Sequence, residues 1–524
     1  MIFFIVSLIP ITIYFIFKTK KVLLMFQQNR YNQNNWYFKW IIKNPDRVFG
    51  GYDLSYLLVF LLGFLINIKL LETLSIIFGI VFTLLYLRKK EIVKKPLVYT
   101  KRVKRLILTF ILLHIIVLLI MNYYYSLEIV NYYYLIIGIL VYLNYFTIYI
   151  ANIINKPIEF IINHNYKLRA IKKLSEMKNM KVIGITGSYG KTSSKNILND
   201  ILNVKYISFP TPKNFNTEAG LINTINNYLD KFNDYFIAEM GALNIYDIKR
   251  YCKLVKPTYG ILTTIGTAHL ETFGSQENIQ KGKFDLIESL PSNGVGVLNA
   301  DDPLQVNFKL KNNCKIIWIG IDNKCDVRAS NIKCSNTGMT FDVVFEGDKN
   351  KYNFKTCLLG KVNIYNILAG IALGKELGLT IDELKRGVLK VKPVEHRLEI
   401  KPYGDMTLID DAYNSNPVGS KMALDVLNMM DGKKIIVTPG MVELGKKQYE
   451  LNEKFGENIS DVCDEVILVG EKQTKPIYDG LINKKYNTKK IHIVNTINEA
   501  FAVLQKIKDD ETIALLENDL PDIF

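Results

Sequence analysis

The hydrophobic positions divide the chain into two parts with different patterns. Up to about residue 155 the apolar residues gather in long runs, whereas after residue 181 they form short groups with the lengths of buried strands and amphipathic helices. A membrane-spanning helix needs about 20 mostly apolar residues. The first part is therefore predicted to be a helical membrane domain with about five spans, at Ile2–Phe17, Leu54–Ile68, Leu70–Leu87, Leu106–Met121 and Leu135–Ile154.

The second part alternates between strand and helix patterns. Near the C-terminus, a strand at Lys434–Thr438 is followed by a helix beginning at Leu444 and a strand at Glu465–Val469, an order that predicts a parallel sheet. The fold class is thus a helical membrane domain followed by an α/β phosphate-loop domain and a Rossmann-like α/β domain. Their predicted limits are residues 1–155, a basic amphipathic helix leading off the membrane at 156–180, then 181–396 and 397–524.

The charge follows the same division. The first 180 residues carry the whole formal net charge of +16, so the second part is neutral, and a nucleic-acid partner is not expected. Lys and Arg flank the apolar runs but are absent from the Asn122–Asn131 loop. This asymmetry predicts an integral protein of the plasma membrane with an external N-terminus and with everything after residue 155 in the cytoplasm. The six Cys follow residue 250 without a CxxC pair, and are expected to be reduced thiols rather than zinc ligands.

A phosphate-binding loop is predicted after the strand Lys181–Ile185. The run Thr186–Ser193 is Gly-rich and leads into a helix that ends near Leu202. Backbone N–H groups and the helix start would hold ATP phosphates, Lys191 would reach the β- and γ-phosphates, and Thr192 would bind Mg²⁺. The predicted nucleotide contacts here are Gly187, Ser188, Gly190, Lys191, Thr192 and Ser193. Ile185 stands where the strict phosphate-loop spacing has its first Gly, so a chance glycine turn is the alternative.

Further motifs follow in a fixed order: Thr211–Glu218, Phe236–Ala242, Ala268–Ser275, Lys283 before Leu290-Pro291, Asn299–Pro303, Asp411–Pro417 and Gly440–Gly445. With the short TGxxGKT loop, they resemble the Mur ligase family, most closely its MurF branch, over about residues 181–450. The resemblance implies an ATP-dependent, ADP-forming ligase. It would join an amino acid or dipeptide to a carboxylate of a cell-wall peptide precursor through an acyl phosphate.

The resemblance also implies roles for single residues. One Mg²⁺ would be held by Thr192 and Glu239, and a second by His269 and a carbamylated Lys283. Lys191, Lys283, Arg397 and Asp411 would be catalytic, with the last two moving onto the phosphates when the domains close. Asn299, Asn366 and Arg397 would contact the nucleotide, and the expected substrate contacts are Asn214, Asn216, Tyr413, Asn414 and Asn416.

Plainer interpretations exist for several of these residues. Without the resemblance, Lys283 is a solvated charge, His269 a structural residue and Glu239 a carboxylate at a strand end. The segment around Tyr413 and Asn416 could be a turn before a helix that begins near Pro417.

Three departures from the family pattern bear on the substrates. Val362 replaces the His of a "GxHNxxN" helix start, and no Lys-Gly-Ser run occurs near the end, where the chain reads Leu515–Pro521. The membrane part leaves no room before the phosphate loop for the family's UDP-sugar domain. These departures leave the incoming amine open and favour a lipid-linked acceptor, the alternative being a soluble UDP-linked peptide.

Other function classes remain as alternatives. One is a Mur-like ligase with a different product, such as a polyglutamate-type synthetase or another cell-wall amino-acid ligase. Another is a non-catalytic ATP-binding membrane protein. A transporter is disfavoured because no predicted span carries paired charges.

Overall fold

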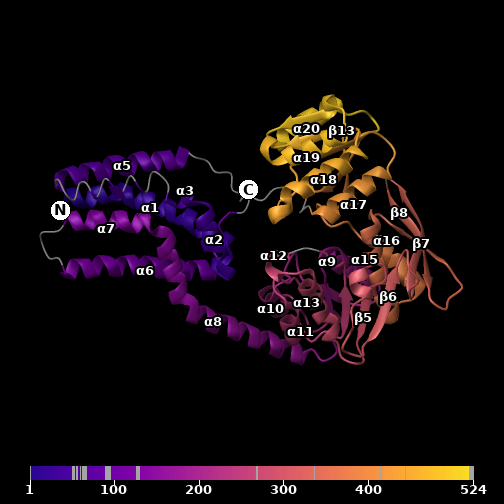
Figure 1. Ribbon diagram of the computed structural model, residues 1–524. Helices are drawn as coiled ribbons and strands as arrows, with labels where there is room; N and C mark the ends of the chain where they lie inside the picture. The colour runs from indigo at the N-terminus through magenta and orange to yellow at the C-terminus, as the bar shows by residue number, and fades with distance from the viewer. Residues whose placement is uncertain are drawn as a thin grey trace. The chain divides into compact units, whose positions relative to one another are not determined.

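The chain forms two compact units that meet within one long helix, one up to Asn165 and the other beginning at Tyr166. The computed structural model describes residues 2–49, 54, 57–58, 61, 68–88, 96–124, 130–266, 270–335, 337–412, 416–442 and 444–518. Figure 1 shows helices alone in the first unit and both helices and strands in the second.

The first unit is a helical bundle around an aromatic core. Phe26, Tyr37, Phe110 and Tyr145 are buried in it, and the Tyr37 hydroxyl donates to the Tyr145 carbonyl at 3.0 Å. The helices are α1 (Ile2–Gln28), the 3₁₀ turn η1 (Arg30–Asn35), α2 (Trp36–Lys43), α3 (Pro45–Val48), α5 (Ile68–Arg88), α6 (Lys101–Tyr124), α7 (Val130–Tyr142) and α8 (Asn144–Glu176).

Only some of the membrane spans predicted from the sequence coincide with single helices in the structure. In the described part of the chain one helix, Lys101–Ile120 in α6, is long and apolar enough to cross a membrane, and a bent pair of helices would add a second. The predicted third span lies within α5, and most of Leu54–Ile68 lies outside the described residues. Helix α1 continues past Phe17 to Gln28, so Lys18, Lys20 and Lys21, the first basic residues after the predicted span, lie inside the same helix.

The predicted fifth span, Leu135–Ile154, is not one straight helix. The helix breaks at Leu143, and α7 and α8 are bent by 78°. A break leaves backbone carbonyls without helical partners. Here the buried Lys18 ammonium donates to the Val141 carbonyl at 2.6 Å, and Asn144 donates to the Thr19 hydroxyl at 3.0 Å. Two polar residues of α1 thus stabilise the bend, and the predicted linker helix 156–180 is the second half of α8 rather than a separate element.

The second unit contains two sheets, as the strand–helix alternation predicts. The first sheet has nine strands in the order β2-β3-β1-β4-β5-β6-β7-β8-β9, parallel as far as β7 and antiparallel from there. Its strands are β1 (Lys181–Thr186), β2 (Ser208–Pro210), β3 (Tyr235–Glu239), β4 (Tyr259–Leu262), β5 (Val295–Asn299), β6 (Lys315–Gly320), β7 (Val327–Ser335), β8 (Gly338–Phe345) and β9 (Tyr352–Thr356).

Helices cover both faces of this sheet because alternate strand residues point to opposite sides. Ile183 belongs to one core, with α9 and α15, whereas its neighbour Val182 belongs to another, with α11 and α13. The helices are α9 (Lys191–Leu202), α10 (Glu218–Asn227), α11 (Asp247–Val255), α12 (Leu270–Phe273), α13 (Gln276–Glu288), α14 (Pro303–Val306), α15 (Lys361–Glu376) and α16 (Ile381–Lys390).

The second sheet has six strands in the order β10-β11-β15-β12-β13-β14, parallel except for β10. Two of its strands, β12 (Lys434–Thr438) and β13 (Glu465–Val469), have the predicted limits, and α17 begins at Pro417 as expected. The other elements are β10 (Glu399–Tyr403), β11 (Met406–Asp411), α17 (Pro417–Asn428), η2 (Gly445–Lys447), α18 (Gln448–Ser460), α19 (Glu471–Asn483), η3 (Thr488–Lys490), β14 (Ile491–Val494), α20 (Ile497–Ile507) and β15 (Ile513–Glu517). The predicted α/β character of both domains is confirmed.

Candidate active site

The phosphate loop connects β1 to α9 at the carboxyl edge of the first sheet. Gly187 and Gly190 have φ values of +154° and +80°, and a Cβ on Gly187 would collide with the Thr263 hydroxyl. Glycine is therefore required at the point where the loop passes the end of β4. The loop is fixed there by the Ser188 N–H, which donates to the Thr264 carbonyl at 2.9 Å.

Lys191 at the start of α9 folds over the loop. Its ammonium donates to the Gly187 and Ser188 carbonyls, both at 2.9 Å. Burial lowers the pKa of Lys191 to about 8; the negative charge of Glu239 opposes this shift and the positive charge of Arg397 adds to it. The two carbonyls hold the Lys191 ammonium beside the phosphate loop, where a phosphate oxygen of bound ATP could replace them as its hydrogen-bond acceptor.

Binding of ATP is therefore expected to weaken as the pH rises above about 8. A bound phosphate favours the Lys191 cation, so the nucleotide complex binds one more proton than the unliganded protein above that pH. The dissociation constant of ATP should rise by close to tenfold per pH unit there, as titration calorimetry can measure. Lys191→Arg keeps the positive charge, so the dissociation constant of ATP should not change with pH in this variant. The same pH dependence in Lys191→Arg would show that a different group titrates.

Glu239 is the centre of a buried polar cluster at the end of β3. One carboxylate oxygen accepts from the Thr192 hydroxyl and from the Asn216 amide, each at 3.1 Å. The other oxygen lies 3.0 Å from the ammonium of Lys195, which also donates to the Lys213 carbonyl at 2.6 Å. The structure thus brings the predicted Thr192, Asn216 and Glu239 together around one carboxylate.

Lys195 was not predicted from the sequence as a site residue. It lies one helical turn after Lys191 on α9, and this i, i+4 spacing places both amines on the same side of the helix. Both Lys195 and Glu239 are buried, and a buried charge needs a partner. The spacing was therefore a usable signal, but only with knowledge of where Glu239 lies.

Replacing Lys195 with Met is expected to lower the free energy of unfolding by about 3–5 kcal/mol, because Glu239 is left as an uncompensated buried charge. Mg²⁺ would then be the remaining cation for Glu239, so added Mg²⁺ should raise the unfolding midpoint more in the variant than in the parent protein. Thermal unfolding with and without Mg²⁺ measures both effects. The double variant Lys195→Met, Glu239→Gln should recover stability and lose the extra Mg²⁺ response; an unaltered single variant would contradict the ion pair.

Lys283 on α13 is also deeply buried, contrary to the interpretation as a solvated charge. Burial lowers its pKa well below the usual value, the charge of Lys191 lowers it further, and Asp247 opposes the shift. Its amine lies 5.6 Å from the centre of the Phe273 ring. Within the described ranges no hydrogen bond or ion pair reaches this amine, so the surroundings favour the neutral form.

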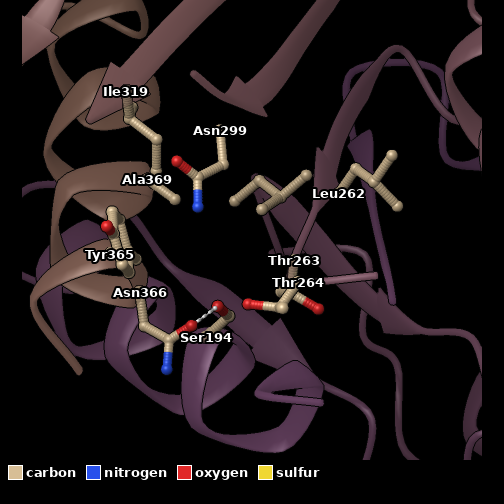
Figure 2. Close-up of a pocket in the computed structure, with 10 residues that line it drawn as sticks. Ser194, Leu262, Thr263, Thr264, Asn299, Ile319, Tyr365, Asn366 and Ala369 are labelled. Carbon is tan, nitrogen blue, oxygen red and sulfur yellow. Dashed lines mark hydrogen bonds between the residues drawn. The ribbon is translucent and has the colours of Figure 1, made fainter. Parts of the chain in front are cut away.

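A small hollow lies beside α9, between β4, β5 and α15. Figure 2 shows Asn299 and Asn366 on its walls, with the amide nitrogen of Asn299 directed into it. The Ser194 hydroxyl donates to Asn366 Oδ1 at 2.8 Å, and Asn299 Oδ1 accepts from the Asp301 N–H at 2.9 Å. Both predicted nucleotide contacts therefore lie next to the phosphate loop, where an adenosine group could reach them.

The second sheet contributes Arg397 and Asp411. Arg397 lies between two residues with left-handed backbone conformations, His396 and Leu398, just before β10. The Asp411 carboxylate accepts from the Leu398 N–H at 3.1 Å and has a hydrogen bond with the buried Glu517 on the adjacent strand β15. Burial raises the pKa of Asp411 to about 6, whereas these hydrogen bonds and the charge of Arg397 act against the rise.

The remaining predicted residues are placed as follows. Ser193 lies in the first turn of α9, and Asn214 is exposed on the loop before Asn216. Asn416 caps α17 by accepting from the Gly419 N–H at 3.0 Å, the structural role given above as the plainer interpretation. His269, Tyr413 and Asn414 lie outside the described residues.

Comparisons with known proteins agree with this geometry. Residues 185–374 match the family described as "Mur ligase middle domain", and residues 396–516 match "Mur ligase, glutamate ligase domain". A UDP-N-acetylmuramoyl-tripeptide–D-alanyl-D-alanine ligase of Bacillus subtilis is 31% identical over 295 residues, covering 56% of this chain and 63% of the relative. The Escherichia coli protein of the same name is 30% identical, covering 56% and 65%. The chain thus spans less than two thirds of either relative.

Solved structures give the same result for the fold. A Thermotoga maritima MurF ligase in complex with ADP aligns with a TM-score of 0.60 at 26% identity, covering 68% of this chain and 80% of that protein. MurF from Acinetobacter baumannii aligns with a TM-score of 0.61 at 23% identity, covering 68% and 77%. The matched shares leave about a third of this chain without a counterpart in either structure.

Proposed function

The chain belongs to the Mur ligase family through its middle and C-terminal domains, and we propose that it is an ATP-dependent, ADP-forming ligase acting on a cell-wall peptide precursor. The observation that carries this proposal is the buried Glu239 carboxylate, held against Thr192 at the end of the phosphate loop. This position places oxygen ligands where Mg²⁺ on the phosphates of a bound nucleotide would need them.

The cluster around Glu239 fits Mg²⁺. Among the residues that the structure describes, no three His, Cys, Asp or Glu side chains form a metal cage. Mg²⁺ does not need one, since it commonly takes one or two protein oxygens and completes its shell with water and phosphate. Thr192 and Glu239 would hold the ion. When bound, ATP would supply the γ-phosphoryl group that converts the substrate carboxylate into an acyl phosphate, with ADP as the other product, and Mg²⁺ would neutralise phosphate charge.

The side chains of this chain then serve two steps. Lys191 would move from the loop carbonyls to the phosphates and neutralise charge that builds up during transfer. Arg397 would add a second positive charge beside Lys191. In the second step the substrate amine forms a bond to the acyl carbon, the nitrogen loses a proton, and phosphate leaves as its C–O bond breaks.

Lys283 is proposed to be carbamylated. Only a neutral amine attacks CO₂: an N–C bond forms and a proton leaves, so that a carboxylate replaces the amine. Burial and the charge of Lys191 both favour the neutral amine. The carbamate would bind a second Mg²⁺ together with His269.

The incoming amine is an amino acid or dipeptide, and D-Ala-D-Ala, named for the relatives, is the first to test. A second candidate is a Mur-like ligase for a different amine, such as a polyglutamate-type synthetase.

The helical unit is proposed to anchor the protein in the plasma membrane, with the ligase domains in the cytoplasm and a lipid-linked acceptor. Exposed aliphatic side chains along α6, such as Leu108, Leu112 and Leu119, support this location. A reporter that is active only outside the cell should be silent when fused after Arg102 or Phe524 and active in the Asn122–Asn131 loop. Activity after Phe524 would contradict the topology.

The ligase activity is tested by phosphate release from ATP with full-length protein in detergent. Release should require both a peptide carboxylate and an amine, and lipid-linked and UDP-linked acceptors should be compared at equal concentrations. Phosphate release that does not depend on either substrate would contradict the proposed ligase activity. Equal rates of phosphate release with the two acceptors would be consistent with the ligase activity but would contradict a preference for the lipid-linked substrate.

A further inference from the structure

The segment between β2 and α10 passes close to the carboxylate at the end of β3. It comprises Thr211–Thr217 and is named the acceptor loop here, because Asn214 and Asn216 are expected to contact the substrate that carries the carboxylate. Backbone hydrogen bonds to β3 and to Gly241, just after it, fix the two ends of the loop. Its middle, which the structure describes completely, is a turn rather than a strand or helix, so its shape depends on side-chain contacts.

A buried lysine holds the middle of the acceptor loop. The Lys195 ammonium donates to the Lys213 carbonyl at 2.6 Å and lies 3.0 Å from a carboxylate oxygen of Glu239. Lys195 and Glu239 are both 1% exposed, so water does not compete for these contacts. Hydrogen bonds from a charged donor are stronger than neutral ones, and more so away from water. One amine thereby connects the acceptor loop to the expected Mg²⁺ ligand.

The backbone of Lys213 needs such a contact. Its φ of +47° lies in the left-handed region, which residues other than Gly occupy only where surrounding contacts stabilise it. The Lys213 side chain is exposed, so its packing does not explain this conformation. The hydrogen bond to the Lys213 carbonyl does, because relaxation of the backbone would move that carbonyl away from Lys195.

A second contact attaches the acceptor loop to the same carboxylate. The Asn216 amide donates to the other oxygen of Glu239 at 3.1 Å, so the loop is joined to Glu239 both directly and through Lys195. Lys195 follows Lys191 and Thr192 by about one turn of α9. The helix thereby sets the distance between the acceptor loop and the residues expected to hold the phosphates and Mg²⁺.

We propose that Lys195 is a positioning residue for the carboxylate substrate, because it holds the acceptor loop in the shape in which Asn214 and Asn216 can contact that substrate. This inference rests on the proposed ligase function. The simpler alternative is that Lys195 only neutralises the buried charge of Glu239. The two roles differ once that charge is removed, because the Lys213 carbonyl still needs a donor.

The test therefore compares Glu239→Gln with the double variant Lys195→Met, Glu239→Gln, as full-length proteins in detergent. Neither has a carboxylate at position 239, and they differ only in the lysine. The N–H groups of Phe215 and Asn216 bond to carbonyls within the acceptor loop, and their hydrogen–deuterium exchange should be at least about tenfold faster in the double variant. Exchange in β1 and β4 should be the same in both. Equal exchange in the acceptor loop would overturn the proposal.

Substrate binding gives the second measurement. Titration calorimetry with UDP-N-acetylmuramoyl tripeptide, the acceptor in the name of the relatives, should give a dissociation constant at least about fivefold higher in the double variant than in Glu239→Gln. The dissociation constant of ADP should differ by less than about twofold, because Lys191 and the phosphate loop are unaltered. A general loss of structure would weaken both ligands together and would contradict a positioning role.

Lys205→Met is the matched control, since Lys205 is an exposed lysine that donates to the Gly378 carbonyl at 2.7 Å. Exchange in the acceptor loop should be the same in this variant as in the parent protein. Faster loop exchange in the double variant with unaltered acceptor binding would also overturn the proposal, because the loop would then not contact the acceptor. Absence of acceptor binding in the parent protein would count against a UDP-linked acceptor rather than against Lys195, because the exchange measurement uses no substrate.

Discussion

Replacing Lys191 with Ala is expected to abolish ATP-dependent ligation while the protein remains folded. Among the described residues, the ammonium bonds only to the Gly187 and Ser188 carbonyls of its own loop. Loss of a cation that stabilises charge in a phosphoryl-transfer transition state commonly costs about 3–4 kcal/mol, or about 10²–10³ in turnover. Phosphate release in the presence of both substrates measures the effect.

The matched control is Lys253→Ala, which removes an exposed lysine from α11. It should retain parental turnover, and both variants should show parental circular dichroism and elution in detergent. If Lys191→Ala keeps more than about a tenth of the parental rate, Lys191 does not perform the role proposed here.

Lys283→Ala is expected to be about as inactive, for a different reason. The proposed carbamate supplies a carboxylate for a metal, and alanine supplies none. Because the neutral amine has no ion pair in the described part of the chain, its removal should disturb folding only by the packing lost around the side-chain methylenes. Formate or acetate in the buffer should restore part of the activity by occupying the space of the carbamate.

Lys281→Ala provides the control, since Lys281 is exposed two residues earlier on the same helix. It should be active with or without added acid. Removal of dissolved CO₂ should also slow the parental enzyme, and bicarbonate should restore it. Near-normal turnover of Lys283→Ala would show that the second metal site is not built on this residue.

The sequence predicted the local elements of the ligase unit well, because their signals are local. Short apolar runs with flanking polar residues located β12 and β13, and the Gly-rich loop located the start of α9. The break between α7 and α8 could not be predicted in this way. It depends on Lys18, which is distant in the sequence, reaching a carbonyl in the middle of an apolar run.

The candidate site could likewise be predicted only in part, because some of its contacts depend on residues that are distant in the sequence. Thr192 was predicted from the phosphate-loop pattern and Glu239 through the family resemblance, and the structure brings them within 3.1 Å. Lys195 was missed because its role depends on the pairing of β1 with β3, which brings Glu239 beside α9. The contact of Asp411 with Glu517 likewise depends on the register of β11 and β15, which neither segment reveals by itself.

The second half of α8 has a consequence for how the ligase domains can be isolated or exchanged. Ala170, Leu174 and Met177 pack into the same core as Phe236 and Ile287, so the end of this helix is a structural part of the central domain. A fragment cut just before β1 would lose these contacts; Leu174 and Met177 are partly buried, so each would contribute less than the roughly 1.5–3 kcal/mol of a fully buried apolar side chain. A fragment that keeps them also keeps the exposed apolar side chain of Ile171. Genetic recombination at the start of β1 would meet the same obstacle, and we expect natural fusions of this ligase to carry the helix with it.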